Sequence, residues 1–262
     1  MFFSRKKPAR SYDPATQQPA LRCSICTGEQ VAGFVHPDGH FEDVQLIRTP
    51  QELAAFRTRY GIDVSSFQGE IDWDAVADDN IDFAMVRVGF RGTGTGSLNT
   101  DKYYEQNIRG AMRAGLETGV YFFAQAVTVE EAIEEADYVI SLLDGLDING
   151  PVAYDWEMHD SSYRVYGTSP EMATACAIAF CQRIKDAGYT PMVYGGTYVT
   201  YMKYDQGALA DYLSWYPEYK SEKSEKLCPT LVYHMDYWQF SSSRAVAGIN
   251  GRVDMNIQFI RR

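Results

Sequence analysis

The spacing of apolar and polar residues changes near Gly61 and divides the chain into two parts. From Gly61 onward, short apolar runs alternate with segments of helical spacing, a pattern typical of βα units around a mostly parallel sheet. The eight predicted strands are Gly61–Val64, Phe83–Gly89, Gly119–Ala124, Val152–Trp156, Pro191–Tyr194, Tyr212–Tyr216, Asp236–Phe240 and Met255–Phe259. Eight strands with intervening helices indicate an α/β fold, a single (β/α)8-type barrel that is partly irregular in its second half.

Three helices of this part are marked by their spacing or by their caps. Helical spacing predicts one over Tyr103–Ala114. Residues 128–131 read Thr-Val-Glu-Glu, a capping box that opens a second helix ending at about Leu143. Ser169 followed by Pro170 opens a third helix, which stops at Gly188.

The first 60 residues are organised differently. Residues 1–20 are polar and contain proline, and we expect a flexible tail. Residues 21–60 are expected to form a small module that precedes the barrel at residues 61–262. In this module, alternating residues at Gln30–Val35 and Phe41–Ile47 flank a Pro-Asp-Gly turn signal, which predicts a β-hairpin. A short helix should follow, marked by Thr49, Pro50, Leu53 and Phe56.

Composition indicates a folded chain that does not bind nucleic acid. Apolar residues make up 45% of the chain and aromatic residues 14%, enough for a sizeable core. The formal net charge is -11, and because residues 1–60 carry eight basic and six acidic residues, the rest of the chain carries -13. Phosphate binding needs clustered lysine and arginine, so this charge disfavours a nucleic-acid partner.

The N-terminal residues do not have the pattern of an export signal. Met1–Arg10 is basic, but it is not followed by the apolar stretch of about 7 to 15 residues that a secretory signal needs. No apolar run approaches the length of a membrane span. We therefore expect a chain made in the cytoplasm without a Sec signal peptide and without a transmembrane segment.

The five cysteines have no regular spacing and are expected to be reduced thiols. Cys23 and Cys26, together with His36 and His40, offer the ligand count of a zinc site. On a hairpin, however, the histidines flank the tip and the cysteines lie at the base, and a strand of about seven residues spans roughly 20 Å. One zinc ion could not reach all four side chains, so we predict no metal and no cofactor.

The two remaining cysteines of interest, Cys176 and Cys181, lie in the third predicted helix. Free cysteine behaves as a small apolar residue and is often buried. We expect both to pack in the core.

Two carboxylates end the fourth predicted strand, in the segment Pro151-Val-Ala-Tyr-Asp-Trp-Glu157. Side chains alternate along a strand, so Asp155 and Glu157 share a face while Trp156 points away, and their Cα atoms are roughly 6–7 Å apart. Two carboxyl groups this close raise each other's cost of ionisation, which favours one protonated group near neutral pH. Such a pair can serve as acid and charge stabiliser in glycosidic cleavage, although a strand end that merely enters a polar loop would look the same.

Further polar residues fall at other predicted strand ends. Asp63 lies in the segment Gly61-Ile-Asp-Val-Ser-Ser-Phe-Gln-Gly69, and Asp254 in Gly251-Arg-Val-Asp-Met-Asn256. The pair Trp238-Gln239 lies in the seventh predicted strand. Because working residues of a barrel sit at strand ends and in the loops that follow, these positions strengthen the interpretation of an active site.

Five ordered motifs resemble glycoside hydrolase family 25, the Chalaropsis-type lysozymes. They are Gly-Ile-Asp-Val-Ser at 61–65, Tyr-Asp-Trp-Glu at 154–157, Trp-Tyr at 215–216, Trp-Gln-Phe-Ser-Ser at 238–242 and Val-Asp-Met-Asn at 253–256. The resemblance runs from about Gly61 to the C-terminus. It implies a β/α barrel that hydrolyses the β-1,4 bond between N-acetylmuramic acid and N-acetylglucosamine in bacterial peptidoglycan, that is, a muramidase.

The resemblance also implies roles for individual residues. Glu157 matches the general acid of the family and Asp155 its partner carboxylate, while Asp63 and Asp254 match acidic residues beside the sugar. The matching lining residues are Tyr121, Tyr154, Trp215, Tyr216 and Gln239. Aromatic side chains suit this role because the apolar C–H faces of sugar rings stack on them.

One position departs from the family. The third strand reads Tyr121-Phe122-Phe123, where the family commonly has histidine in the middle. A position that faces away from the sugar would tolerate this change.

Two other functions are compatible with the same residues. The barrel could bind cell wall without turnover, although all four acidic positions are present. Alternatively, the N-terminal module could dock a partner while the barrel is incidental. For a muramidase we expect a monomer that acts on the wall after lysis or after release by a non-Sec route.

Overall fold

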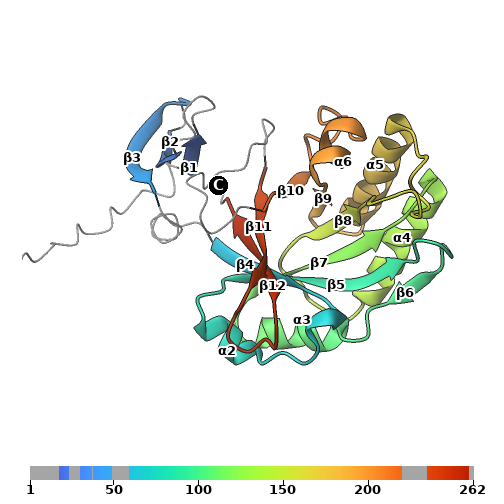
Figure 1. Ribbon diagram of the computed structural model, residues 1–262, viewed down its shortest axis with the longest axis horizontal. Helices are drawn as coiled ribbons and strands as arrows, with labels where there is room; N and C mark the ends of the chain where they lie inside the picture. Colours follow the sequence, from blue (N-terminus) through green and yellow to red (C-terminus); the bar gives the residue numbers. More distant parts are fainter. Residues whose placement is uncertain (1–17, 24–29, 37, 49–58, 220–234, 260–262) are drawn as a thin grey trace, which may run out of the picture. The chain divides into compact units, whose positions relative to one another are not determined.

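The computed structural model describes residues 18–23, 30–36, 38–48, 59–219 and 235–259 (Figure 1). The chain folds into two compact units, with a boundary between Thr58 and Arg59. The smaller unit contains the N-terminal strands. The larger unit, made of residues 59–221 and 229–258, contains the barrel.

The smaller unit holds a three-stranded antiparallel sheet in the order β1-β2-β3. Strands β2 (Gln30–Val35) and β3 (Phe41–Ile47) are the predicted hairpin, and Gly39 adopts a φ of 82° in the turn. Strand β1 (Gln18–Cys23) was not predicted, and its first residues belong to the segment expected to be a tail. The sequence of β1 lacks regular alternation of apolar and polar residues, so no pattern marks it as a strand. Its pairing with the free edge of β2 needs only backbone groups.

Other predictions for this unit are untested. The helix marked by Thr49, Pro50, Leu53 and Phe56 and the thiol of Cys26 lie outside the described residues, as does the side chain of Cys23. The ring centroids of His36 and His40 are 5.9 Å apart. Because both cysteine thiols lie outside the described residues, the absence of a metal stays a prediction.

The larger unit is a closed barrel of eight strands, which confirms the predicted fold class. Seven parallel strands follow one another around it: β4 (Arg59–Val64), β5 (Phe83–Arg91), β7 (Glu117–Ala124), β8 (Val152–Trp156), β9 (Pro191–Tyr194), β10 (Leu213–Pro217) and β11 (Tyr237–Arg244). The eighth, β12 (Val253–Gln258), closes the barrel between β11 and β4. A short strand, β6 (Leu98–Thr100), pairs antiparallel with the C-terminal end of β5.

Strand β12 is antiparallel to both of its neighbours. A parallel strand would need a crossover connection of a dozen or more residues, and the segment between Arg244 and Val253 is shorter than that. The sequence indicated an irregular second half of the barrel, and the structure shows the irregularity as a last strand that runs in the reverse direction. As a result, the N-terminal end of β12 lies at the rim where the other strands have their C-terminal ends.

Helices cover the outside of the barrel (Figure 1). They are α2 (Trp73–Asp78), α3 (Tyr104–Arg113), α4 (Val129–Leu142), α5 (Pro170–Asp186) and α6 (Thr197–Met202), with a 3-10 turn, η1, at Ser66–Gln68. The three predicted helices are α3, α4 and α5. Among the described residues, no helix is long and apolar enough to cross a membrane.

The predicted cap of α5 forms, but the capping box of α4 is only half made. Ser169 Oγ accepts from the backbone N–H of Met172, and Thr128 Oγ1 accepts from that of Glu131. The Glu131 carboxylate instead accepts from the N–H of Val127 and pairs with Arg164. It is therefore part of a tertiary network.

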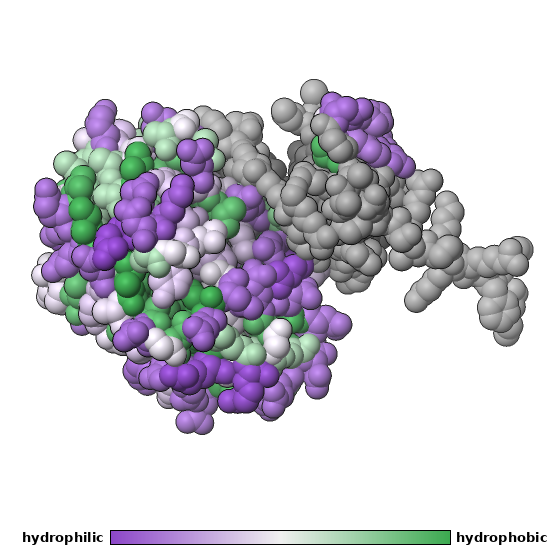
Figure 2. All heavy atoms as spheres, turned by 180° about the vertical axis from the view of Figure 1, so that it is seen from behind, coloured by the Kyte–Doolittle hydropathy of each residue, from purple (hydrophilic) through white to green (hydrophobic). Residues whose placement is uncertain are grey.

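Strand alternation separates two apolar layers. Side chains inside the barrel include Phe83, Met85, Ala153, Met192, Tyr194, Trp215 and Tyr237. The alternate residues of the same strands pack outward against the helices, as Val152, Tyr154 and Trp156 do on β8. Cys176 and Cys181 of α5 are buried in this outer layer, as the sequence predicted. On the face shown in Figure 2, hydrophilic and hydrophobic residues are interspersed on the surface of the barrel unit.

Candidate active site

A pocket of about 230 Å³ opens at the barrel rim where the parallel strands end. It is lined by Asp63, Ser65, Phe67, Gln68, Arg87, Tyr121, Phe123, Asp155, Glu157, Tyr194, Trp215, Tyr219, Gln239 and Asp254. All four acidic residues singled out from the sequence are in this lining, together with Tyr121, Trp215 and Gln239.

Asp155 and Glu157 project from β8 and from the residue that follows it. Asp155 is buried, and its Oδ1 atom has no hydrogen-bond partner among the described residues. Burial, followed by the charge of Glu157 and a side-chain hydrogen bond with it, raises the pKa of Asp155 well above its ordinary value, against the opposing charge of Arg87. Burial therefore favours the protonated form of Asp155. Glu157 lies nearer the solvent, with Oε2 2.8 Å from Nε2 of His159.

Asp63 and Asp254 form the second carboxyl pair of the pocket. They face each other across the antiparallel ladder of β4 and β12. Burial and the Asp254 charge raise the pKa of Asp63 to about 8, although two amide donors stabilise its charged form. These donors are Nε2 of Gln239 and Nδ2 of Asn256, each 2.8 Å from Oδ2 of Asp63.

A series of side-chain hydrogen bonds orients the pocket residues around Asp63. The indole N–H of Trp215 donates to Oδ1 of Asn256 at 2.8 Å. The hydroxyl groups of Tyr194 and Tyr219 donate to Oε1 of Gln239 at 3.2 and 3.0 Å. Since both amide oxygens are acceptors, both amide nitrogens must point at Asp63, and the network fixes their orientation.

Sequence reasoning missed Arg87 and Phe67. Arg87 lies inside the barrel on β5, where its guanidinium bonds to Asp101 at 2.8 Å and to Ser66 Oγ at 3.2 Å. The Phe67 ring lies 5.0 Å from this guanidinium, and the residue is 84% exposed at the pocket edge. Alternation from Phe83 would have placed Arg87 inside the barrel, but it could not show that the residue reaches the pocket.

Two predicted lining residues, Tyr154 and Tyr216, do not reach the pocket. Tyr154 is fully buried against Phe180 of α5, with ring centroids 4.7 Å apart. The Tyr216 hydroxyl is 2.8 Å from Thr197 Oγ1. Each neighbours an inward-pointing residue on its strand and therefore points outward. Applied consistently, the alternation that pairs Asp155 with Glu157 would have excluded both.

The middle residue of the third-strand motif also faces outward. Phe122 packs in the helix layer, with its ring centroid 6.2 Å from that of Tyr138 on α4. Tyr121 and Phe123 on either side of it line the pocket. The departure at position 122 therefore leaves the pocket wall unaltered.

The pocket combines proton donors, negative charge and aromatic surface. Each carboxyl pair contains a buried member whose protonated form is favoured. Tyr121 and Tyr194 both pack edge to face with Trp215, with centroids 6.0 and 4.9 Å away. This arrangement suits acid catalysis on a neutral, hydroxyl-rich molecule with apolar faces.

Comparisons with known proteins agree with these features. The family model described as glycosyl hydrolases family 25 matches residues 62–249. The autolytic lysozyme of Clostridium acetobutylicum is 26% identical over 197 residues, which cover 75% of this chain and 54% of that protein. Lysozyme M1 of Streptomyces globisporus is 27% identical over 201 residues, covering 75% of this chain and 66% of that protein. The chain thus spans about half the length of the first relative and two thirds of the second.

Solved structures share the barrel. The bacterial lysozyme from Streptomyces coelicolor aligns with a TM-score of 0.61 at 24% identity, covering 76% of this chain and 91% of that one. The spore cortex lytic enzyme SleM of Clostridium perfringens aligns with a TM-score of 0.63 at 21% identity, over 77% of this chain and 67% of that one. At these identities the likeness concerns the fold.

Proposed function

Since this chain belongs to glycosyl hydrolases family 25, we propose that it is a peptidoglycan hydrolase of the muramidase type. Its substrate would be the β-1,4 bond between N-acetylmuramic acid and N-acetylglucosamine. The observation that carries the proposal is the convergence of Asp63, Asp155, Glu157 and Asp254 with an aromatic wall in one pocket. The two named lysozymes among its relatives support the same substrate class.

Glu157 is the proton donor in this proposal. It is the more exposed member of its pair, so it can reach a glycosidic oxygen at the pocket mouth. Asp155 is buried deeper in the pocket, where its protonated form is favoured. When a sugar amide N–H approaches Asp155, ionisation of Asp155 is favoured, and the proton passes to Glu157 across the hydrogen bond between the two carboxyls.

Bond cleavage would then use the substrate's own 2-acetamido group. Its carbonyl oxygen attacks the anomeric carbon, Glu157 gives its proton to the leaving oxygen, and the glycosidic bond breaks. Asp155 accepts a hydrogen bond from the acetamido N–H and stabilises the positive charge of the cyclic intermediate. Water then opens this intermediate and returns a proton to Glu157, so the configuration is retained.

The remaining lining residues would hold the sugar. Trp215 and Tyr121 present aromatic surface, and Gln239 presents its amide between Asp63 and the two tyrosine hydroxyls. We also propose that residues 61–262 form a catalytic domain that folds without the N-terminal module, because every family motif lies there.

Release of reducing sugars from purified peptidoglycan tests this function. Turnover that is absent from a Glu157→Gln, Asp155→Asn double variant would support a muramidase. A wild-type protein that co-sediments with wall but releases no reducing ends would instead be a wall-binding module. One that neither binds nor cleaves wall would contradict both.

A further inference from the structure

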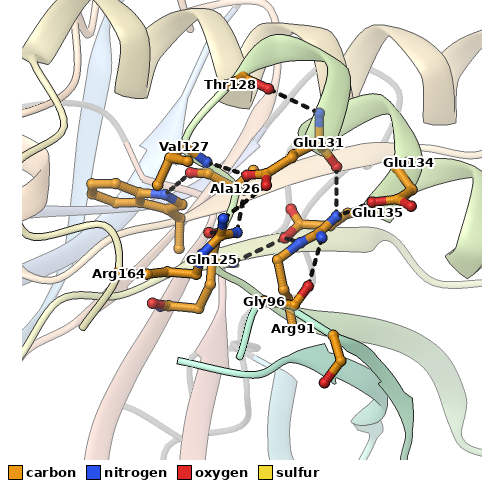
Figure 3. A network of polar contacts seen from close by, with 12 residues as sticks. Arg91, Gly96, Gln125, Ala126, Val127, Thr128, Glu131, Glu134, Glu135 and Arg164 are labelled. Carbon is orange, nitrogen blue, oxygen red and sulfur yellow. Dashed lines mark hydrogen bonds and ion pairs between the residues drawn. The ribbon is translucent and has the colours of Figure 1, made fainter. Parts of the chain in front are cut away.

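A network of buried and partly buried charged side chains converges on Gln125, the residue that follows β7 (Figure 3). Gln125 is fully buried and forms hydrogen bonds through both its backbone and its side chain. Its backbone N–H donates to Oε1 of Glu135 at 3.0 Å, and its carbonyl accepts from Nη1 of Arg164 at 2.9 Å. Its side-chain Nε2 donates to the backbone carbonyl of Glu157 at 2.7 Å.

Two arginine–glutamate pairs hold Gln125 in place. Arg91 on β5 donates to Oε1 of Glu135 at 2.8 Å, and both of these side chains are buried. Arg164 forms a two-pronged pair with Glu131 of α4, at 2.7 and 2.9 Å. Charge-assisted and two-pronged hydrogen bonds are strong and directional, so they restrict the groups that they join.

The neighbours of Gln125 are fixed as well. The indole N–H of Trp156 donates to the carbonyl of Ala126 at 3.0 Å, and the N–H of Val127 donates to Glu131 at 2.8 Å. The ends of β7 and β8 are therefore joined side by side to α4. Gln125 belongs to a segment with little freedom to move.

The loop that begins with Glu157 is anchored on this segment at two points. The Glu157 carbonyl accepts from the Gln125 side chain, and Arg164, later in the same loop, donates to the Gln125 carbonyl. The Glu157 carboxylate pairs with His159, an exposed residue of the same loop, and shares a hydrogen bond with Asp155, but neither contact holds the Glu157 backbone carbonyl. The backbone position of Glu157 thus depends on Gln125 more directly than on any pocket residue described.

We propose that Gln125 is a positioning residue that sets the backbone of Glu157 and, through it, the direction in which Glu157 presents its carboxyl group to the sugar. This inference rests on the proposed role of Glu157 as proton donor. Gln125 does not line the pocket, so it acts through Glu157. The competing interpretation is that Gln125 only stabilises the barrel.

Gln125→Met distinguishes the two interpretations, because methionine has a similar length and volume but no N–H donor. A displacement of about 1 Å can cost on the order of 100-fold in rate, so kcat should fall roughly 10- to 100-fold. KM should stay within about two-fold, since the aromatic wall is unchanged. Gln182→Met is the matched control: Gln182 is exposed on α5 and donates to Asp186, so its loss should leave kcat unchanged.

A double variant supplies a readout that a purely structural role would not produce. In a Glu157→Gln background there is no donor left to position, so Gln125→Met should cause almost no further loss of kcat. A full, additive loss would overturn the proposal. So would a Gln125→Met protein with wild-type kcat.

Hydrogen exchange tests the positioning independently of turnover. Gln125→Met should raise amide exchange in residues 157–164 while β4, β5 and β12 keep wild-type protection. If the wild-type protein releases no reducing ends, the proposed function fails, and this experiment alone decides whether Gln125 holds the loop. Exchange that rises across the whole barrel, or stays unchanged in residues 157–164, would overturn the inference.

A second variant covers the case in which Gln125→Met does not fold. Arg164→Lys keeps the positive charge near Glu131. It loses the planar guanidinium that donates to the Glu131 carboxylate and to the Gln125 carbonyl at the same time. We expect the same signature, a lower kcat at nearly constant KM with faster exchange in residues 157–164. An Arg164→Lys protein with wild-type values of all three would contradict the proposal.

Discussion

Asp254, at the N-terminal end of β12, lies directly opposite Asp63, at the C-terminal end of β4, across an antiparallel ladder. Had β12 run parallel to its neighbours, the start of the strand would lie at the other end of the barrel. The reversal therefore brings a carboxyl from near the C-terminus to the rim that carries Asp155 and Glu157. It also places two carboxyl groups close enough for one to keep its proton.

The buried Asp63 should make the stability of the barrel decrease with rising pH. Its pKa is raised from 3.8 to about 8, so between these values the folded state holds a proton that the unfolded chain has lost. The stabilising contribution is complete below about pH 4 and is lost as pH rises through 8. One such group gives a slope of at most about 1.4 kcal/mol per pH unit.

Urea unfolding of the wild-type protein and of Asp63→Asn between pH 5 and 8 checks this. Asparagine keeps an oxygen that can accept from Gln239 and Asn256, so the variant should fold while its unfolding free energy varies less with pH. Equal slopes in the two proteins would mean that Asp63 is ionised in the folded state.

Glu157→Gln should lose turnover but keep binding to the wall. General acid catalysis contributes about 10² to 10⁴ in rate, and glutamine cannot give up a proton to the leaving oxygen. Reducing-sugar release and co-sedimentation with peptidoglycan measure the two properties separately. Near-normal turnover by a folded Glu157→Gln protein would remove Glu157 from the role of acid.

Hydrolysis should give the β anomer first, without a sugar bound to the enzyme. Asp155 and Glu157 come from the same strand end and share a hydrogen bond, so Asp155 approaches the sugar beside the donor rather than from the opposite face. That position suits assistance to the acetamido group better than direct attack. NMR of the first-formed product tests this, and α product or a trapped ester on Asp155 would contradict it.

Removal of residues 1–58 should leave a folded and active enzyme. The first boundary between the two compact units lies between Thr58 and Arg59, and Arg59 begins the first barrel strand. Circular dichroism and the reducing-sugar assay on the truncated chain provide the check. An insoluble or inactive product would show that the barrel or its pocket needs the N-terminal module.

Tyr154→Phe should leave both turnover and KM unchanged. The Tyr154 side chain lies in the helix layer, and its hydroxyl has no hydrogen-bond partner among the described residues. Loss of an unsatisfied buried hydroxyl should change the unfolding free energy by no more than about 1 kcal/mol, in the stabilising direction. Tyr194→Phe is the contrasting variant: it removes a donor to Gln239 in the pocket and should raise KM. Similar kinetic effects of both changes would contradict the placement of Tyr154 in the core and Tyr194 in the pocket.

The sequence alone determined the features that depend on local pattern. Apolar runs located all eight barrel strands, and Ser169 and Thr128 located two helix starts, because burial of a strand and capping of a helix need only neighbouring residues. Period-two alternation likewise paired Asp155 with Glu157. Strand β1 escaped detection because its pairing with β2 uses backbone groups that every sequence carries.

Tertiary structure decided what depends on residues far apart in the chain. Closure of the barrel set the direction of β12 and thereby joined Asp254 to Asp63. The approach of β5 to η1 brought Arg87 beside Phe67. Glu131 has the sequence of a capping residue, yet its carboxylate pairs with Arg164, since a partly buried arginine is stabilised by a charged partner. Such contacts follow from how the strands close and how the helices pack on them, and local spacing carries no record of either.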